Sequence, residues 1–235
     1  MSELVCWMAV PDTLAGEISR LRALLTPAER ARADRFRFAT DRMAYVTAHG
    51  LLRAELGRRL GEAPERVEIV HDAMGKPGLA GPRASALYFS ISHSRGYVAC
   101  AFSRVKVGVD IEQIDREIDP AVAKVLSGLE RRHLDSLEPE DRTAAFLEIW
   151  TMKEAALKAY GTGLSTPLDG FSVCAASRCV RPGAGSPLPA ARHWSVTLRH
   201  LGVGSVCSVA RIGGGPHIPP MKFKEWLYQD FDLHL

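Results

Sequence analysis

The sequence has few of the features that mark membrane, disulfide-bonded or strongly basic proteins. No apolar run approaches the roughly 20 residues of a membrane-spanning helix, and Met1–Val10 carries the acidic Glu3 where a secretory signal would be basic. The five cysteines are odd in number and form no C-x-x-C pair, which favours reduced thiols over a disulfide framework or a zinc site. The net charge of +3 is too small to indicate nucleic acid by itself. We therefore expect a cytoplasmic protein without a membrane or nucleic-acid partner.

Length and composition are those of an ordinary globular protein. The chain has 235 residues, of which 46% are apolar and 24% are charged, within the usual range for soluble domains. It is long enough to bury a core as one domain or as two. Evidence on function must therefore come from the motifs.

A short alternating stretch at Lys106–Glu112 is the first motif that indicates chemistry. Its apolar residues alternate with a glycine and two carboxylates, which is the pattern of a strand with one apolar face. Asp110 and Glu112 therefore point to the same side, with their backbones roughly 7 Å apart. Like charges held this close cost free energy unless a cation or a proton lies between them. The stretch thus favours a cation site at these two side chains.

A second stretch, Arg142–Tyr160, is predicted to be a helix because helix formers dominate it and neither proline nor glycine interrupts it. Trp150, Glu154 and Lys158 lie at positions i, i+4 and i+8, and hence on one face of that helix. Three carboxylates without histidine or cysteine nearby suit Mg²⁺ or Mn²⁺ better than Zn²⁺. A lysine beside such an ion indicates a substrate that carries phosphate.

Both motifs also have simpler interpretations. A D-x-E pair on a strand is commonly the solvated face of a sheet, and Glu154 with Lys158 would then be an ordinary helix ion pair that contributes about 0.2–0.5 kcal/mol. Small residues crowd Glu154 and Lys158 in the sequence. They favour a helix face that packs against another element over a face that lies in water.

Three blocks of sequence resemble a known family. Phe89–Ser94 reads F-S-I-S-H-S, Gly108–Glu112 reads G-V-D-I-E, and Trp150–Lys158 reads W-T-M-K-E-A-A-L-K. In this order and spacing they resemble the 4'-phosphopantetheinyl transferases of the Sfp type, and the resemblance extends more weakly over nearly the whole chain. It implies an α+β fold of two similar subdomains packed as a pseudo-dimer, with coenzyme A in the cleft between them. The order of predicted elements repeats after Ser103, so we expect subdomains at residues 1–103 and 104–235.

The resemblance also implies roles for individual residues. The implied metal ligands are Asp110, Glu112 and Glu154, with Glu130 as an acidic group farther from the ion. The implied catalytic groups are Glu154, as a base that acts directly or through a metal-bound water, and Lys158, which steadies or protonates the leaving phosphate. The implied contacts to coenzyme A are Arg32, Lys76, Ser92, His93, Lys153 and Lys158. Glu29 stands at a 3'-phosphate position that is basic in some relatives.

Local signals predict further elements. Ser127 and Glu130 form an S-x-x-E pattern, so a helix capping box is the alternative to a place for Glu130 near the metal. Thr26-Pro27 predicts the start of a helix in an Arg-rich helical region that extends to about Leu60. The other expected elements are strands at Leu4–Val10, Val67–Val70, Leu87–His93, Tyr97–Phe102, Phe171–Ala175, Trp194–Leu201 and Val203–Arg211, helices at Leu14–Leu25, Ala121–Leu126 and Met221–Leu235, and a flexible loop at Arg181–Ala191.

The substrate protein that the resemblance implies is an acyl carrier protein or a peptidyl carrier protein, docked near Leu164–Leu168 on a monomeric enzyme. Two other functions stay open from the sequence. One is a Mg²⁺-dependent hydrolase of a nucleotide or pyrophosphate. The other is a nucleic-acid-binding protein, because ten arginines fall between Arg20 and Arg59, although arginines interleaved with alanine are mostly a solvated helix face. Nucleophilic catalysis by Ser92 with His93 is not expected, because neighbours on a strand point to opposite faces.

Overall fold

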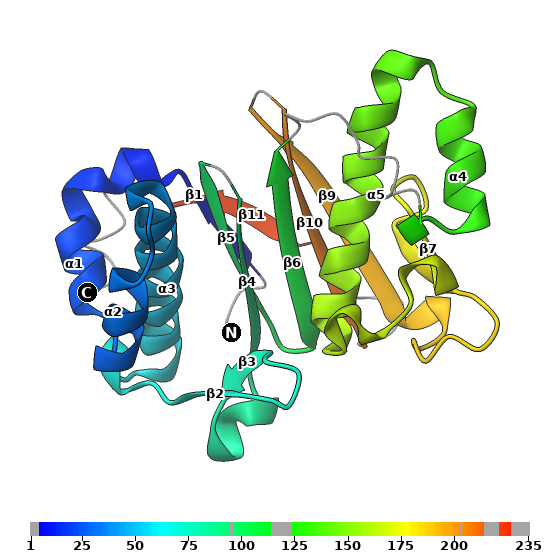
Figure 1. The fold of residues 1–235 in the computed structure, drawn as a ribbon. Coiled ribbons are helices and arrows are strands. Elements are labelled where there is room, and N and C mark those ends of the chain that lie inside the picture. The colour runs from blue at the N-terminus through cyan, green and yellow to red at the C-terminus, as the bar shows by residue number, and fades with distance from the viewer. Residues whose placement is uncertain (1–4, 95, 114–123, 203, 214–220, 227–235) are drawn as a thin grey trace.

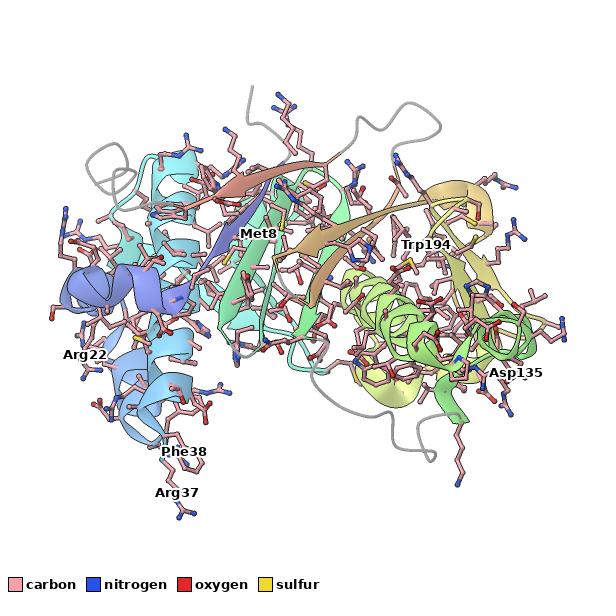
Figure 2. The ribbon with its side chains drawn as sticks, turned by 90° about the horizontal axis from the view of Figure 1, so that it is seen from above. Met8, Arg22, Arg37, Phe38, Asp135 and Trp194 are labelled. Carbon is pink, nitrogen blue, oxygen red and sulfur yellow. The ribbon has the colours of Figure 1, made fainter. Side chains whose placement is uncertain are left out.

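The fold is a stack of two β-sheets between two helical layers (Figure 1). It is seen in a computed structural model that describes residues 5–94, 96–113, 124–202, 204–213 and 221–226. One helical layer and most of one sheet come from the N-terminal half of the chain, and the other sheet with its helices comes from the C-terminal half. Viewed from above, Arg22 and Phe38 lie on the helical layer of the N-terminal half, and Asp135 lies on the other helical layer at the opposite side of the molecule (Figure 2). The chain is therefore the mixed α+β structure of two packed halves that was predicted.

The N-terminal half contributes a helical layer and three strands of the first sheet. Its elements are β1 (Val5–Ala9), α1 (Ile18–Ala23), α2 (Pro27–Asp34), α3 (Ala39–Leu60), β2 (Ile69–His71), β3 (Pro77–Leu79), β4 (Tyr88–Ser94) and β5 (Tyr97–Ser103). The predicted start of α2 is confirmed, because the Thr26 hydroxyl accepts a hydrogen bond from the Glu29 N–H and the Glu29 carboxylate accepts one from the Thr26 N–H. Helix α3 ends at Gly61, whose φ of 65° suits glycine.

The C-terminal half contributes the second sheet and the helix that carries the third sequence block. Its elements are β6 (Lys106–Gln113), α4 (Gly128–Asp135), α5 (Pro139–Tyr160), β7 (Phe171–Cys174), β8 (Cys179–Pro182), β9 (Trp194–Leu201), β10 (Ser205–Ile212) and β11 (Lys222–Glu225). The predicted capping box at Ser127 and Glu130 is present at the start of α4. Helix α5 ends at Tyr160, the predicted last residue, and Gly161 follows it with a φ of 94°.

The two sheets pack face to face, and each is covered by a helix on its outer side. β11, β1, β5 and β4 form the first sheet in that order, and β6, β10 and β9 form the second. Small and aliphatic side chains fill the space between the sheets, among them Met8, Ala101, Val109 and Val209. Helix α3 packs against the first sheet and α5 against the second. As a result β4 and β6, the edge strands that carry the first two sequence blocks, lie along each other.

Gly108 sets how closely α5 approaches β6. A Cβ atom at Gly108 would overlap the backbone of α5 at Ala155 and Ala159, so only glycine fits there without a shift. The helix backbone therefore rests directly on β6. This close approach brings the side chains of Glu154 and Lys158 level with Asp110, two residues farther along the strand.

Three predicted segments differ from the structure. The predicted helix Leu14–Leu25 is an α-helix only over Ile18–Ala23, because its first residues belong to a 3-10 helix, Pro11–Glu17. The predicted loop Arg181–Ala191 begins inside β8, because Val180 is buried and pairs with Val173 of β7. The predicted helix Met221–Leu235 begins instead with a strand, β11, which pairs in parallel with β1. An open strand edge offers backbone hydrogen bonds that no periodicity in the sequence can show. Residues 227–235 of that prediction, and part of the predicted helix Ala121–Leu126, lie outside the described residues.

Two expectations from composition can be compared with the structure. Within the described ranges, no helix has the length and apolar character needed to cross a membrane. All five cysteines carry free thiols, as predicted, and those of Cys6, Cys100 and Cys207 are buried.

Candidate active site

The three sequence blocks meet at one point where β4, β6 and α5 come together. Lys158 Nζ lies 2.7 Å from Asp110 Oδ1 and donates a hydrogen bond to Ser92 Oγ at 3.0 Å. Ser92 Oγ in turn donates to the same Asp110 oxygen at 2.9 Å. An ammonium, a carboxylate and a hydroxyl from three different elements thus form one closed triangle. Ser92 and Asp110 are buried within it.

Glu112 and Glu154 add negative charge beside Asp110. Burial, followed by the charge of Asp110, raises the pKa of each of these two carboxyls above its ordinary value. The Lys158 ammonium acts in the opposite direction on both. Glu112 and Glu154 thus each lie within electrostatic range of Asp110 and Lys158, and Lys158 is in direct contact with Asp110. The joint role of these four residues as one site stays a prediction.

These carboxylates fit a hard divalent cation in their chemistry. As they stand, no three acidic, histidine or cysteine side chains of the described residues are placed closely enough to hold a metal ion. Lys158 occupies Asp110 Oδ1, but Asp110 Oδ2 is buried without a hydrogen-bond partner in the described part of the chain. A buried carboxylate oxygen without a partner is unfavourable, and carboxylate oxygens are the protein ligands that Mg²⁺ takes. The carboxylate oxygens of Asp110, Glu112 and Glu154, with Asp110 Oδ2 available as a ligand, fit Mg²⁺ or Mn²⁺ in their chemistry.

A row of basic and aromatic side chains leads from α2 to this group. The Arg32 guanidinium lies 5.7 Å from the centroid of the Tyr45 ring, and Tyr45 stacks on His49 with the ring centroids 4.0 Å apart. Loss of water around the His93 ring, followed by the charges of His49 and Lys158, lowers the pKa of His93. His93 therefore lies within electrostatic range of both α3 and α5. The row joins the two predicted coenzyme contacts Arg32 and His93 through residues that the sequence did not single out.

Glu29 has a structural partner in Arg53. The Arg53 guanidinium donates to Glu29 Oε2, and His49 Nδ1 lies 3.9 Å from the other oxygen. Burial alone would raise the pKa of Glu29, but the nearby His49 ring and hydrogen bonds from Arg53 and the Thr26 N–H lower it to about 2. The carboxylate thus stays charged and fastens α2 to α3. At a position where the family resemblance implies a basic group, this chain thus carries a fixed negative charge.

Lys76 connects the loop before β3 to the end of α5. Its Nζ donates a hydrogen bond to the carbonyl oxygen of Ala159 at 3.0 Å. Burial, followed by the charge of Lys106, lowers the pKa of Lys76 to about 8. A pocket of about 230 Å³ lies between this loop, β4 and α5, and Lys76, Ser90 and Lys158 are among its lining residues. Its two lysines make this pocket suitable for an anionic ligand.

A second and larger pocket lies away from these groups. It measures about 380 Å³ and is lined by Met8, Tyr97 and Leu201, among others. None of the predicted site residues lines it. Size alone therefore does not locate the site, and the smaller pocket with its titratable groups is the better candidate.

Glu130 and Lys153 form a separate buried pair. Lys153 Nζ lies 2.9 Å from Glu130 Oε2, and both side chains are almost fully enclosed. Glu130 Oε1 also accepts from the Val173 N–H, and Lys153 donates to the carbonyl oxygens of Leu168 and Phe171. These two residues do not join the Asp110 group. The predicted contact of Lys153 with coenzyme A and the predicted place of Glu130 near a metal stay predictions, and this burial argues against the first.

The sequence did not single out several residues that shape the site. Ser94 donates to Glu112, Ser90 accepts from the Val109 N–H, and Gly108 admits α5. The serines at every second position of β4 could have indicated this, because the alternation of a strand places their hydroxyls on one face, where they can bind a neighbouring element. An isolated glycine in an apolar strand is the corresponding signal for close backbone approach.

The ion pairs of the N-terminal helices account for much of the arginine content. Arg20 pairs with Glu17, Arg22 with Asp34, Arg53 with Glu29, and Arg58 and Arg59 with Glu55. These arginines join helices or consecutive turns of a helix. They therefore give no support to nucleic-acid binding.

Two family models cover the chain. The model of the 4'-phosphopantetheinyl transferase superfamily matches residues 106–210, and the model of the 4'-phosphopantetheinyl transferase N-terminal region matches residues 7–104. The border between the matched segments falls close to the predicted subdomain boundary. The second match also covers residues upstream of the three sequence blocks.

Curated relatives carry the same family name. The chain is 33% identical to the 4'-phosphopantetheinyl transferase HetI of Nostoc sp., over 69% of this chain and 70% of the relative. It is 32% identical to the 4'-phosphopantetheinyl transferase Sfp of Bacillus subtilis, over 67% of this chain and 69% of the relative. A solved structure, the holo-[acyl-carrier-protein] synthase of Thermotoga maritima, is similar over 46% of this chain and 63% of that chain, at 20% identity and a TM-score of 0.35. On the family models and the curated relatives, the chain belongs to the 4'-phosphopantetheinyl transferase superfamily.

Proposed function

We propose that this protein transfers the 4'-phosphopantetheine group of coenzyme A to a serine hydroxyl of an apo acyl or peptidyl carrier protein and releases 3',5'-ADP. Membership of the family supports the reaction. The observation that carries the proposal is the triangle of Ser92, Asp110 and Lys158. It brings the three sequence blocks together beside a pocket with two lysines.

Mg²⁺ is the cofactor that the carboxylates fit best, with Mn²⁺ as a substitute. Asp110, Glu112 and Glu154 would hold the ion, and when bound it would supply positive charge to offset the charge that develops on the pyrophosphate. The place of Glu112 and Glu154 within range of the Asp110 charge supports this assignment, because a cation offsets the repulsion that, after burial, raises the pKa of both carboxyls.

The chain's own residues bind coenzyme A and move the proton. Arg32, His93 and Lys76 face the nucleotide and its phosphates in this proposal. Lys76 lines the pocket, His93 is within electrostatic range of Lys158, and Arg32 lies over the Tyr45 ring, which supports these roles. The carrier serine oxygen forms a bond to the phosphorus of the phosphopantetheine arm, and the bond from that phosphorus to the bridging oxygen of 3',5'-ADP breaks. Glu154 accepts the serine proton, and Lys158 donates a hydrogen bond or a proton to the departing phosphate.

Glu154 is suited to the role of base by its surroundings. Its raised pKa makes it a stronger base than an ordinary carboxylate. Binding of a cation would lower that pKa, because it would offset the repulsion from Asp110 and Glu112. The variant Glu154→Gln keeps the side-chain volume and removes the acceptor. We expect it to fold and to lose transfer.

The carrier protein would dock beside Leu164–Leu168, which follows the pocket-lining Gly163. Exposed arginines of the N-terminal half would steer an acidic carrier, in which case the rate of modification falls as salt is added. We also propose the subdomain division at residues 103 and 104 and a monomeric enzyme, since the two halves of one chain supply both sides of the pocket.

The direct test is to incubate the protein with coenzyme A, Mg²⁺ and several purified apo carriers and to weigh each carrier by mass spectrometry. The expected result is a carrier heavier by one phosphopantetheine group, with 3',5'-ADP in solution. Wild-type protein and Glu154→Gln are compared under the same conditions. Cleavage of coenzyme A without any change in the carriers would point to a hydrolase and overturn the proposal.

A further inference from the structure

Serine hydroxyls join the two halves of the protein along β4 and β6. These strands are edge strands of separate sheets, and no backbone ladder pairs them in the described residues. The contact between them consists in part of three hydrogen bonds from one face of β4. Their atoms come from Ser90, Ser92 and Ser94, which alternate with residues that pack toward the helices.

The three serines have different partners. Ser90 Oγ accepts a hydrogen bond from the backbone N–H of Val109 at 3.1 Å. Ser92 Oγ donates to Asp110 at 2.9 Å, and Ser94 Oγ donates to Glu112 Oε2 at 3.0 Å. The first bond holds the strand backbone. The other two hold the carboxylates of the proposed metal site, so part of that site is fixed by the opposite half of the chain.

The hydrogen bond from Ser94 restricts the orientation of the Glu112 carboxylate. Glu112 follows Asp110 by two residues on β6, so the two carboxylates lie on one face of the strand and repel each other, and a carboxylate on a flexible side chain can rotate away from such a neighbour. A hydroxyl donor on the facing strand opposes that rotation. Groups that orient a metal ligand in this way typically change metal affinity by about 10–100-fold when removed.

We propose that Ser94 is a positioning residue that holds Glu112 across the β4–β6 contact, so that the metal site is complete only when the two halves are packed together. The inference rests on the proposed function for the identity of the metal site. It goes beyond that proposal because it assigns a role to a residue outside the ligands and the coenzyme contacts. Ser90 provides the matched comparison, because its bond belongs to the same contact but reaches no carboxylate.

The test is direct Mn²⁺ binding, measured by electron paramagnetic resonance of the free ion, to wild-type protein, Ser94→Ala, Ser94→Thr and Ser90→Ala. We expect Ser94→Ala to raise the Mn²⁺ dissociation constant about tenfold or more. Ser94→Thr keeps the hydroxyl and should stay close to the wild-type value. Ser90→Ala should lower the melting temperature while it leaves Mn²⁺ affinity unchanged.

Kinetics separate positioning from a general loss of structure. In Ser94→Ala the Mg²⁺ concentration for half-maximal transfer should rise by the same factor, with the KM for coenzyme A unchanged at saturating Mg²⁺. Wild-type Mn²⁺ affinity in Ser94→Ala, or an equal loss in Ser90→Ala, would overturn the inference. Because Mn²⁺ binding needs no carrier, weakened binding in Ser94→Ala supports the positioning role even if no carrier is modified, an outcome that would refute the proposed function alone.

Discussion

A methyl group on Gly108 would overlap the carbonyl oxygen of Ala155. Strand β6 and helix α5 are in backbone contact at this point, so the distance between them cannot be adjusted by a side chain. Asp110 lies two residues after Gly108 on the strand, and Lys158 lies one turn after Ala155 on the helix. The 2.7 Å contact between their side chains depends on this approach.

The substitution Gly108→Ala is therefore expected to disturb fold and site together. Overpacking of a rigid contact typically costs about 1–3 kcal/mol, which urea unfolding will measure as a lower midpoint. Loss of carrier modification should accompany it. Gly16→Ala is the matched control, because a Cβ atom there meets open space. Near-wild-type stability and activity in Gly108→Ala would show that α5 can move without consequence.

Lys158 neutralises Asp110 in the metal-free protein, so its removal should make stability depend on Mg²⁺. Lys158→Gln leaves a buried carboxylate without its cation, which is expected to lower the free energy of unfolding by about 1–3 kcal/mol. Added Mg²⁺ should restore part of that loss, because the ion supplies the missing positive charge. Thermal unfolding with and without Mg²⁺ will measure it, with Asp110→Asn/Lys158→Gln as the control. If Mg²⁺ stabilises the double variant just as strongly, the ion binds elsewhere.

The pKa of Lys76 predicts how coenzyme binding changes with pH. Burial lowers this pKa to about 8, so the ammonium loses its proton as the pH rises through that value. If Lys76 binds a phosphate of coenzyme A, affinity is highest below this pH and falls above it. Isothermal titration from pH 6.5 to pH 9.5, on the order of 1.5 units either side of that pKa, should show the fall. Lys76→Arg keeps its charge over this range and should remove the effect, whereas the same fall in Lys76→Arg would exclude Lys76 as its source.

The pair of Glu130 and Lys153 is expected to matter for stability alone. Both side chains are buried, so removing one charge leaves the other unpaired and typically costs about 3–5 kcal/mol. Glu130→Gln should therefore unfold at lower urea while the Mg²⁺ dependence of the remaining activity stays the same. The double variant Glu130→Gln/Lys153→Met should recover stability relative to the single variant. A changed Mg²⁺ requirement in Glu130→Gln would instead place this carboxylate near the ion.

Local periodicity was sufficient for the parts of the site that lie within one element. Alternation in Lys106–Glu112 places Asp110 beside Glu112, and helical spacing places Glu154 beside Lys158. Both depend on neighbours along the chain, so the sequence specifies them. The meeting of Asp110 with Lys158 depends on how β6 packs against α5, and in the sequence only the family resemblance indicates it.

Strand alternation and helical spacing could not predict contacts between segments that lie far apart in the sequence. β11 is a strand because β1 has an open edge, a condition that lies more than two hundred residues upstream. Lys153 matches the family motif, but its side chain pairs with the buried Glu130 and does not contact Ser92, Asp110 or Lys158. Ser94 belongs to the first sequence block, but its hydrogen bond to Glu112 depends on the packing of β4 against β6, which the sequence does not show. Residue type and spacing predicted the chemistry, and packing decided which residues take part in it.

The central claim is that Asp110, Glu112 and Glu154 hold one divalent ion on which transfer depends. The most direct measurement is a Mn²⁺ titration followed by electron paramagnetic resonance in the presence of coenzyme A, with Asp110→Asn compared to wild type. We predict one tightly bound ion per wild-type chain and a loss of at least about a hundredfold in affinity in Asp110→Asn, while Glu130→Gln binds as wild type does. Equal Mn²⁺ binding by Asp110→Asn and the wild-type protein would contradict the account.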